Sequence, residues 1–368
     1  MTPGASSSPS GPLAGERGSP VVAVDCNGAD LGPAEVAAGA AIAAGEGARV
    51  LLFGPARELG EPPAGVEIVD APISVAKAPD PVLAVRTTPQ ASIVQAARAV
   101  AQGRAQALVC AGATGAALAA GTFNIKRARG IYRPALAIPL PVPGRPVTLL
   151  DVGASAEARR EHLVQFAFMG AALARTVLGV SAPRVGLLSN GEEQARGSAL
   201  VLEAHAELRE RTTNARAGLD PFEFVGNLEG GDVVSGVADV IVTDGFTGNV
   251  ALKLMEGVSQ AMLGTIREAA MSSTQAKLGG LLLRGALRGF RDEIDPEANG
   301  GAYLLGLRSL GVVAHGRFAR AGFAHAILRA ERGAREDIVA QTHSALDRAG
   351  ALRRPPASAS LASLPQAQ

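Results

Sequence analysis

The sequence predicts an α/β protein with a mostly parallel, mixed sheet covered by helices on both faces. Short β-rich runs recur along the chain, and most are followed by a small or polar turn and an alanine-rich helical segment. The runs are apolar on both faces, which is typical of strands in a parallel sheet. The expected strands cover 21–25, 49–53, 66–70, 106–110, 134–140, 147–151, 184–189 and 238–244.

Two of these runs, 134–140 and 147–151, are separated only by a Pro/Gly-rich turn. Parallel neighbours need a much longer crossover, so this pair is expected to form an antiparallel hairpin. The hairpin makes the sheet mixed.

The composition narrows the class of protein. With 368 residues, of which 47% are hydrophobic, the chain can bury a large core without help from disulfides or metal. The formal net charge of +1, the 3% aromatic content and the absence of Trp disfavour nucleic-acid binding. No histidine shows metal-ligand spacing with carboxylates or cysteines, so no metal is expected.

The ends of the chain and its cysteines indicate a cytoplasmic protein. Residues 1–19 and 353–368 are rich in Ser, Pro and Ala without apolar periodicity, so both are expected to be disordered tails around one folded unit at 20–352. There is no signal-peptide pattern and no bilayer-spanning apolar stretch. Cys26 and Cys110 are expected to be buried, reduced thiols.

Small and polar residues follow the first and fourth expected strands, at the strand ends where α/β proteins bind ligands. The first strand ends on Asp25 and is followed by Asn27, Gly28 and a helix that begins at Pro33. Strand-to-helix loops of purely structural role share this pattern.

The turn "CAGATGAALAAG" after the fourth strand should leave bare N–H groups at a helix start. Its small residues are Gly112, Thr114 and Gly115. It is neither a Walker loop nor a clear dinucleotide fingerprint, so the spacing alone is a weak signal.

A third cluster, "LLSNGEEQARGS", carries Asn190 and then Glu192, Glu193 and Arg196, which are expected in the first turns of a helix. A structural interpretation pairs Arg196 with Glu192, four residues earlier. The functional interpretation has Arg196 reaching a phosphate while a glutamate orients it.

The fourth cluster, "VTDGFTGNV", ends a strand on Asp244 and starts a helix with Gly245, Phe246, Thr247, Gly248 and Asn249. Small residues at a helix N-terminus uncover N–H donors that suit an anion. Lys253 lies one turn after Asn249 on the same face. It is therefore expected to approach that anion.

His315 and Gly316 precede the last long helical segment of the folded unit. A lone histidine in such a loop is more often a cap or surface group than a catalyst.

Residues 257–290 are expected to be helical, and "KLGGLLLRGALRGF" mixes leucines with basic residues at the tip of this region. Such a patch suits a membrane surface or a partner, and equally a leucine face buried in a dimer.

Seven ordered stretches, including "VDCNGADLGP", "AGATGA", "LDVGASAEARREHLVQFAFMG", "LLSNGEEQARG" and "DVIVTDGFTGNVALKLMEG", resemble the signatures of PlsX, the bacterial acyl-ACP:phosphate acyltransferase family. The resemblance covers about residues 20–332. It implies a Rossmann-like α/β/α fold of the kind found in isocitrate dehydrogenases and phosphotransacetylases. It also implies a homodimer, and peripheral membrane contact through a helical tip around 257–292, specifically 277–291.

The resemblance further implies that acyl-ACP and inorganic phosphate react to give acyl phosphate and free acyl carrier protein, without a cofactor. The pathway that the resemblance implies is the synthesis of phospholipids or of a specialised lipid. The matching motif positions are Asp25, Gly28, Asp30, Gly112, Thr114, Gly115, Glu192, Glu193, Asp244, Gly245, Phe246, Thr247, Gly248, Asn249, Lys253, His315 and Gly316.

Phosphate is itself a nucleophile and a thiolate is a tolerable leaving group, so the site mainly has to position the reactants and stabilise an oxyanion. We expect donors from the AGATG and DGFTGN helix starts, charge from Arg196 and Lys253, and proton transfer or orientation from Asp244 and His315. Cys110 as a covalent acyl carrier is an alternative.

Some positions depart from the family pattern. Ala113 and Ser155 stand where the family commonly has Asn, and Arg196 where it has Lys. Two alternatives therefore stay open: a catalytically weakened paralogue that acts as an ACP- or membrane-binding scaffold, and a phosphotransacetylase-like enzyme that uses acyl-CoA.

Overall fold

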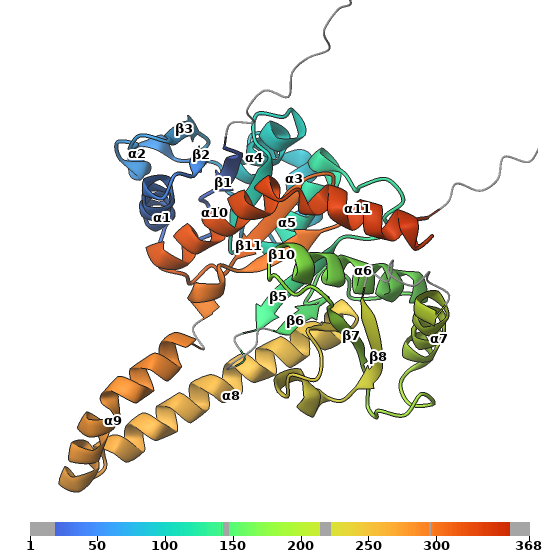
Figure 1. Ribbon diagram of the computed structural model, residues 1–368. Helices are drawn as coiled ribbons and strands as arrows, with labels where there is room; N and C mark the ends of the chain where they lie inside the picture. Colours follow the sequence, from blue (N-terminus) through green and yellow to red (C-terminus); the bar gives the residue numbers. More distant parts are fainter. Residues whose placement is uncertain (1–18, 141, 143–146, 214–221, 294–295, 354–368) are drawn as a thin grey trace, which may run out of the picture.

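A computed structural model describes residues 19–140, 142, 147–213, 222–293 and 296–353 (Figure 1). The tails expected at 1–19 and 353–368 lie outside the described residues, except for Ser19 and Arg353, the residue of each tail next to the folded unit.

The described residues form one eleven-stranded sheet in the order β3-β2-β1-β4-β11-β10-β5-β6-β9-β7-β8. The strands are β1 (Val21–Asp25), β2 (Arg49–Gly54), β3 (Val66–Asp70), β4 (Ala107–Ala111), β5 (Ala135–Leu140), β6 (Val147–Leu150), β7 (Arg184–Leu188), β8 (Glu223–Leu228), β9 (Val240–Val242), β10 (Ala302–Leu305) and β11 (Leu310–Ala314). The mixed α/β fold predicted from the sequence is confirmed.

All eight expected runs are strands, and β5 pairs with β6 in antiparallel register as predicted. The sequence analysis missed β8, β10 and β11. Gly226 and Asn227 interrupt the apolar pattern of β8, and β10 has only four residues. Short or interrupted runs give too little periodicity to separate from a loop.

The two ends of the sheet run in opposite directions. β10 is antiparallel to both β11 and β5, and β5 is antiparallel to β6. Consequently β6, β9, β7 and β8 run against β1, β4 and β11. The carboxyl ends of the two groups of strands therefore point to opposite edges of the sheet.

Helices cover both faces of the sheet, because strand residues are apolar on both sides. One face packs α1 (Pro33–Gly45), α6 (Arg160–Thr176), α7 (Ala199–Thr213), α10 (Arg320–Arg335) and α11 (Ile338–Arg348). The other packs α3 (Pro81–Thr87), α4 (Ser92–Ala101), α5 (Thr114–Ala120) and its continuation η1 (Gly121–Ile125). The short elements are α2 (Ala56–Leu59), η2 (Gly230–Val234) and η3 (Pro296–Asn299).

Two helices, α8 (Gly245–Met271) and α9 (Thr274–Glu293), form a hairpin that projects from the body of the molecule (Figure 1). Large apolar side chains are exposed along it, among them Leu254 at 65% and Leu282 at 79%. Within the described residues, no helix has the length and apolarity needed to cross a bilayer.

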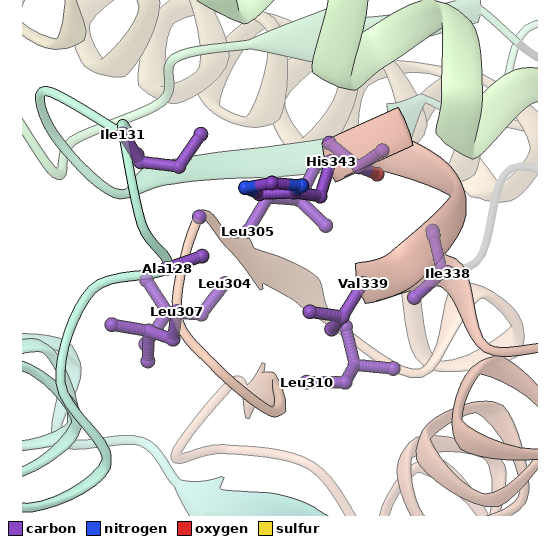
Figure 2. Close-up of a pocket in the computed structure, with 11 residues that line it drawn as sticks. Ala128, Ile131, Leu304, Leu305, Leu307, Leu310, Ile338, Val339 and His343 are labelled. Carbon is purple, nitrogen blue, oxygen red and sulfur yellow. The ribbon is translucent and has the colours of Figure 1, made fainter. Parts of the chain in front are cut away.

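A small apolar cavity lies between β10, β11 and α11 (Figure 2). Its volume of about 20 Å³ is room for about one water molecule. The hydroxyl of Thr342, which lines it, is buried without a partner. The cavity is too small for a substrate, so the candidate site lies elsewhere.

Candidate functional site

Three loops meet at the carboxyl ends of the adjacent parallel strands β1, β4 and β11, through Gly28, Gly112 and Gly316. A Cβ on Gly28 would lie 1.7 Å from the carbonyl oxygen of Ala111, and one on Gly112 would lie 2.5 Å from the Cα of Gly316. Gly112 also has a φ of +81°, which favours glycine. We call this contact of three glycines the first junction.

Helix α5 starts at the first junction with open amides. Its N-cap residue, Ala113, has no side chain able to accept a hydrogen bond. The N–H groups of Gly115 and Ala116 have no acceptor among the described residues, and Gly115 is exposed. Uncovered amides at a helix N-terminus are suited to an anion, as the sequence predicted for this turn.

Charged side chains from β11 and α8 gather beside the first junction. His315 follows β11, and its pKa is lowered by burial and by the positive charges of Arg317 and Lys253. Glu256 pairs with Lys253 at 2.9 Å and with Arg317 at 3.6 Å. The structure thus brings Lys253 to His315 and Gly316, although Lys253 belongs to the helix that starts at the opposite edge of the sheet.

Asp25, at the end of β1, is buried under the first junction and only 2% exposed. Burial raises the pKa of its carboxyl to about 6, although hydrogen bonds from Ser92 and Asn27 oppose this. The Ser92 hydroxyl donates to Asp25 Oδ1 at 2.5 Å and accepts from Asn27 Nδ2 at 2.9 Å. Asp25 is therefore positioned to hold Asn27 and its loop rather than to touch a ligand.

The two thiols are buried and unpaired, as expected. Burial and the neighbouring Asp25 raise the pKa of both Cys26 and Cys110. A thiolate is the reactive form, so this environment makes Cys110 a poor nucleophile.

A second close contact, the second junction, joins the loop after β6 to the start of α8. A Cβ on Gly248 would lie 1.9 Å from the carbonyl oxygen of Asp151, and one on Gly245 would lie 2.6 Å from that of Ser155. The buried Asp151 carboxylate accepts N–H groups from Leu136, Gly153, Ala154 and Ser155. Burial raises the pKa of Asp151 against these bonds.

The start of α8 is already satisfied within the protein. Asp244 is its N-cap, with Oδ1 accepting from Thr247 N at 2.9 Å and Oδ2 from Thr247 Oγ1 at 2.7 Å. The amide of Gly245 donates to Ser155, and that of Gly248 to Asp244. The expectation of bare amides here is therefore wrong for three of the first four residues, leaving Phe246, whose side chain is 66% exposed.

Asn249 and Lys253 are also turned to internal partners. Asn249 Nδ2 donates to the carbonyl oxygen of Val152 at 3.1 Å. The Lys253 ammonium contacts Glu256, further along α8, and not the helix start. An anion at the start of α8 would thus find neither side chain free.

The third cluster is a loop, so its prediction as a helix start is wrong. Helix α7 begins only at Ala199, after Asn190, Glu192, Glu193 and Arg196. Asn227 Nδ2 donates to the carbonyl oxygens of Glu193 and Arg196, and Gly197 has a φ of +112°, so the backbone cannot continue as helix. Arg196 pairs with Glu193 at 3.7 Å, not with Glu192.

Residues 21–341 match the family described as fatty acid synthesis protein. The chain belongs to this family. The resemblance to PlsX seen in the sequence is therefore confirmed.

Two relatives named phosphate acyltransferase are similar to this chain over most of its length. A phosphate acyltransferase of Thermobifida fusca is 43% identical over 318 residues, covering 84% of this chain and 87% of its own. One of Pelotomaculum thermopropionicum is 40% identical, covering 86% and 91%. Among solved structures, EutD phosphotransacetylase from Staphylococcus aureus matches with a TM-score of 0.56 at 16% identity, covering 86% of this chain and 94% of its own. That last likeness confirms the predicted phosphotransacetylase-like fold.

The structure locates two residues that depart from the family pattern, Ala113 and Ser155. Ala113 caps α5 at the first junction, and Ser155 lies in the second, where its hydroxyl is buried without a partner. Sequence reasoning missed Ser92, Asp151 and the segment 74–78, which faces Asn27 and Gly28 across a cleft. Asp151 lay inside a quoted stretch, but nothing local marks a carboxylate that collects four amides.

Proposed function

We propose that this chain is a phosphate acyltransferase that converts acyl-ACP and inorganic phosphate to acyl phosphate and free acyl carrier protein. Relatives of that name, about two fifths identical over most of the chain, support it. The observation that carries the proposal within the structure is the start of α5, where uncovered amides stand over three glycines beside His315 and Lys253. Phosphate is the anion proposed to bind there.

In the proposed step, a phosphate oxygen bonds to the thioester carbon. The carbon–sulfur bond then breaks, and the sulfur leaves as a thiolate that takes up a proton. The Gly115 and Ala116 amides are suited to hold phosphate or the tetrahedral oxyanion without reorganisation. Lys253 lies on the same side, where its ammonium is paired with Glu256.

His315 is suited to donate a hydrogen bond as a neutral imidazole. Its lowered pKa keeps it uncharged at neutral pH. Its Nδ1 accepts from Arg317 N at 3.3 Å, which leaves the proton on Nε2. That N–H would face phosphate or the oxyanion. Asp244, expected to move a proton or orient donors, is instead assigned the role of helix cap.

The experiment mixes purified protein, acyl-ACP and labelled phosphate and measures labelled acyl phosphate. Formation of the product supports the proposal, and its absence with intact, folded protein refutes it. A parallel reaction with acyl-CoA distinguishes the phosphotransacetylase-like alternative. Binding of acyl-ACP without any product would favour the scaffold.

We also propose that the partner across α8 is a second copy of this chain. Val250, Leu254, Val258, Met262 and Ile266 recur every four residues and are 40–65% exposed. Two such ridges interdigitate in the commonest mode of helix packing. In sedimentation experiments, Val258→Asp combined with Met262→Asp is expected to give monomers. Gln260→Asp, on the opposite face of α8, should leave the dimer intact.

Helix α9 is the proposed membrane contact, at 277–291. Leu278, Leu281, Leu282 and Leu283 are 58–79% exposed, with Lys277 and Arg284 nearby in sequence. Leucines beside basic residues suit an anionic lipid surface. The protein should float with anionic vesicles, and Leu282→Asp should abolish this. Equal binding by the variant would remove α9 from the contact.

A further inference from the structure

A cleft beside the first junction is lined by two segments. One is the β1–α1 loop at 26–29 with Pro33, and the other is the irregular segment 74–78. Its volume of about 400 Å³ lies in the range of clefts that bind small molecules, about 300–1,000 Å³. None of the motifs found in the sequence includes the segment 74–78.

The cleft adjoins the first junction through Gly28. Gly28 lines it, while the Gly28 carbonyl oxygen would lie 2.7 Å from a Cβ on Gly112. Beyond the end of the segment, Pro81 at the start of α3 lies next to the start of α5, where its Cγ would lie 3.0 Å from a Cβ on Gly115. If the reacting carbon of a ligand is held at the start of α5, the chain attached to that carbon would therefore lie next to this cleft.

The lining has the chemistry of a hydrocarbon site. Ala29, Val75, Ala76 and Ala78 supply small apolar surfaces, and Lys77 is the one charged residue in the lining. The residues that line the cleft include no acid, and the Ser74 hydroxyl already donates to Asn27 O. Large apolar side chains are exposed on the adjoining chain, including Leu31 at 63% and Ile73 at 44%.

We propose that this cleft binds the acyl chain of the donor, and that Ala76 and Ala78 set the chain length it accepts. The proposal rests on the proposed function for the identity of the donor. Two hydrogen bonds fix the distance between the two sides of the cleft. Ser74 Oγ donates to Asn27 O at 2.7 Å, and Asn27 Nδ2 donates to Ala71 O at 3.0 Å. Larger side chains at 76 and 78 would fill the space rather than widen it.

The kinetic test compares short-chain and long-chain acyl-ACP as donors for Ala76→Leu and Ala78→Leu. Burying a methylene contributes about a factor of four, so a leucine that displaces three of them should lower kcat/KM for the long chain about 50-fold. The value for the short chain should stay within about twofold of wild type. The control is Ala206→Leu on an exposed position of α7, which should change neither donor. Equal loss for both chain lengths, or no loss, overturns the proposal.

A second test needs no turnover. Wild-type protein is irradiated with a long-chain acyl-ACP that carries a diazirine at the end of its chain, and the labelled peptide is sequenced. Labelling within 71–83 or 26–33 supports the cleft. Labelling on α8 or α9, or labelling of the cleft only by a diazirine placed on the pantetheine arm, overturns it. If no acyl phosphate forms but the cleft is labelled, the proposed function fails and the acyl-chain site stands.

Discussion

The first and second junctions are built alike and equipped differently. Each closes a strand-to-helix contact on a glycine where a Cβ would lie within 2 Å of a carbonyl oxygen, at Gly28 and at Gly248. In the second, Asp151 and Asp244 absorb the amides around them. In the first, the N–H groups of Gly115 and Ala116 at the start of α5 have no acceptor among the described residues, and the imidazole of His315 is half-buried. Glycine motifs therefore indicate close backbone packing. The difference between a ligand site and a purely structural contact lies in the N–H donors that have no acceptor within the described protein.

The largest expected effect tests the shared construction. Gly28→Ala and Gly248→Ala should each lower the free energy of unfolding by about 3 kcal/mol, because the Cβ would overlap a backbone carbonyl. Denaturant unfolding measures this. Gly257→Ala on α8, where a Cβ meets nothing within 4 Å, is the matched control and should gain up to about 1 kcal/mol in helix propensity. A loss well below about 3 kcal/mol in either variant would contradict the close backbone contact at that junction.

The buried carboxylates provide the next test. The pKa of Asp25 is about 6 in the folded protein against an ordinary 3.8, so the folded state binds more protons between these values. The contribution of Asp25 to stability is therefore fully present below pH 3.8 and is lost as the pH rises through 6, a fall of about 3 kcal/mol from this group. Asp25→Asn keeps an acceptor for Ser92 and should lack this fall. Parallel pH profiles for variant and wild type would contradict the burial of a charged Asp25.

A third pair of variants separates the two junctions by activity. His315→Gln should lower kcat about 100-fold, the scale of losing a positioned hydrogen-bonding or proton-transferring group, with little change in stability. Asn249→Ala should instead cost about 1 kcal/mol of stability for one lost hydrogen bond and leave most of kcat. Kinetics and unfolding are measured on the same preparations. The reverse outcome would move the reaction to the second junction.

The smallest expected effect concerns the helix cap. Asp244→Ala should cost about 1 kcal/mol, the usual value of an N-cap, while the KM for phosphate stays within about twofold. A large rise in that KM would mean that Asp244 belongs to the phosphate site. Thr247→Val, which loses only the hydroxyl bond to Asp244, serves as the milder comparison.

Most of the sheet was predictable from local pattern, because runs such as 21–25 and 106–110 are apolar on both faces and are followed by a small or polar turn. The strand directions were not, because they follow from the antiparallel pairing of β10 with β5 and β11, residues far apart in the chain. As a result, clusters expected at one edge of the sheet lie at two.

The site was predictable in its glycines and not in its hydrogen bonds. Gly28, Gly112 and Gly316 were singled out by type and position. Asp244 and Thr247, three residues apart, form a local N-cap pattern that the phosphate interpretation of this stretch did not use. That Asn227 would hold the backbone around Glu193 and Arg196 depends instead on partners far away in the chain, which no short stretch displays.

Helix α8 runs unbroken for 27 residues from the second junction, past the ion pairs at Glu256, to its turn with α9. At about 1.5 Å and 100° per residue, its length fixes both the reach of the hairpin and the direction its leucines face. Excising four residues beyond Glu256 would shorten the reach by about 6 Å and swing the far end by about 40°, whereas excising seven would nearly restore the heading at a shorter span. The length of α8 therefore sets both the distance and the orientation of the hairpin tip, so insertions or deletions in α8 should be tolerated best in steps of seven residues.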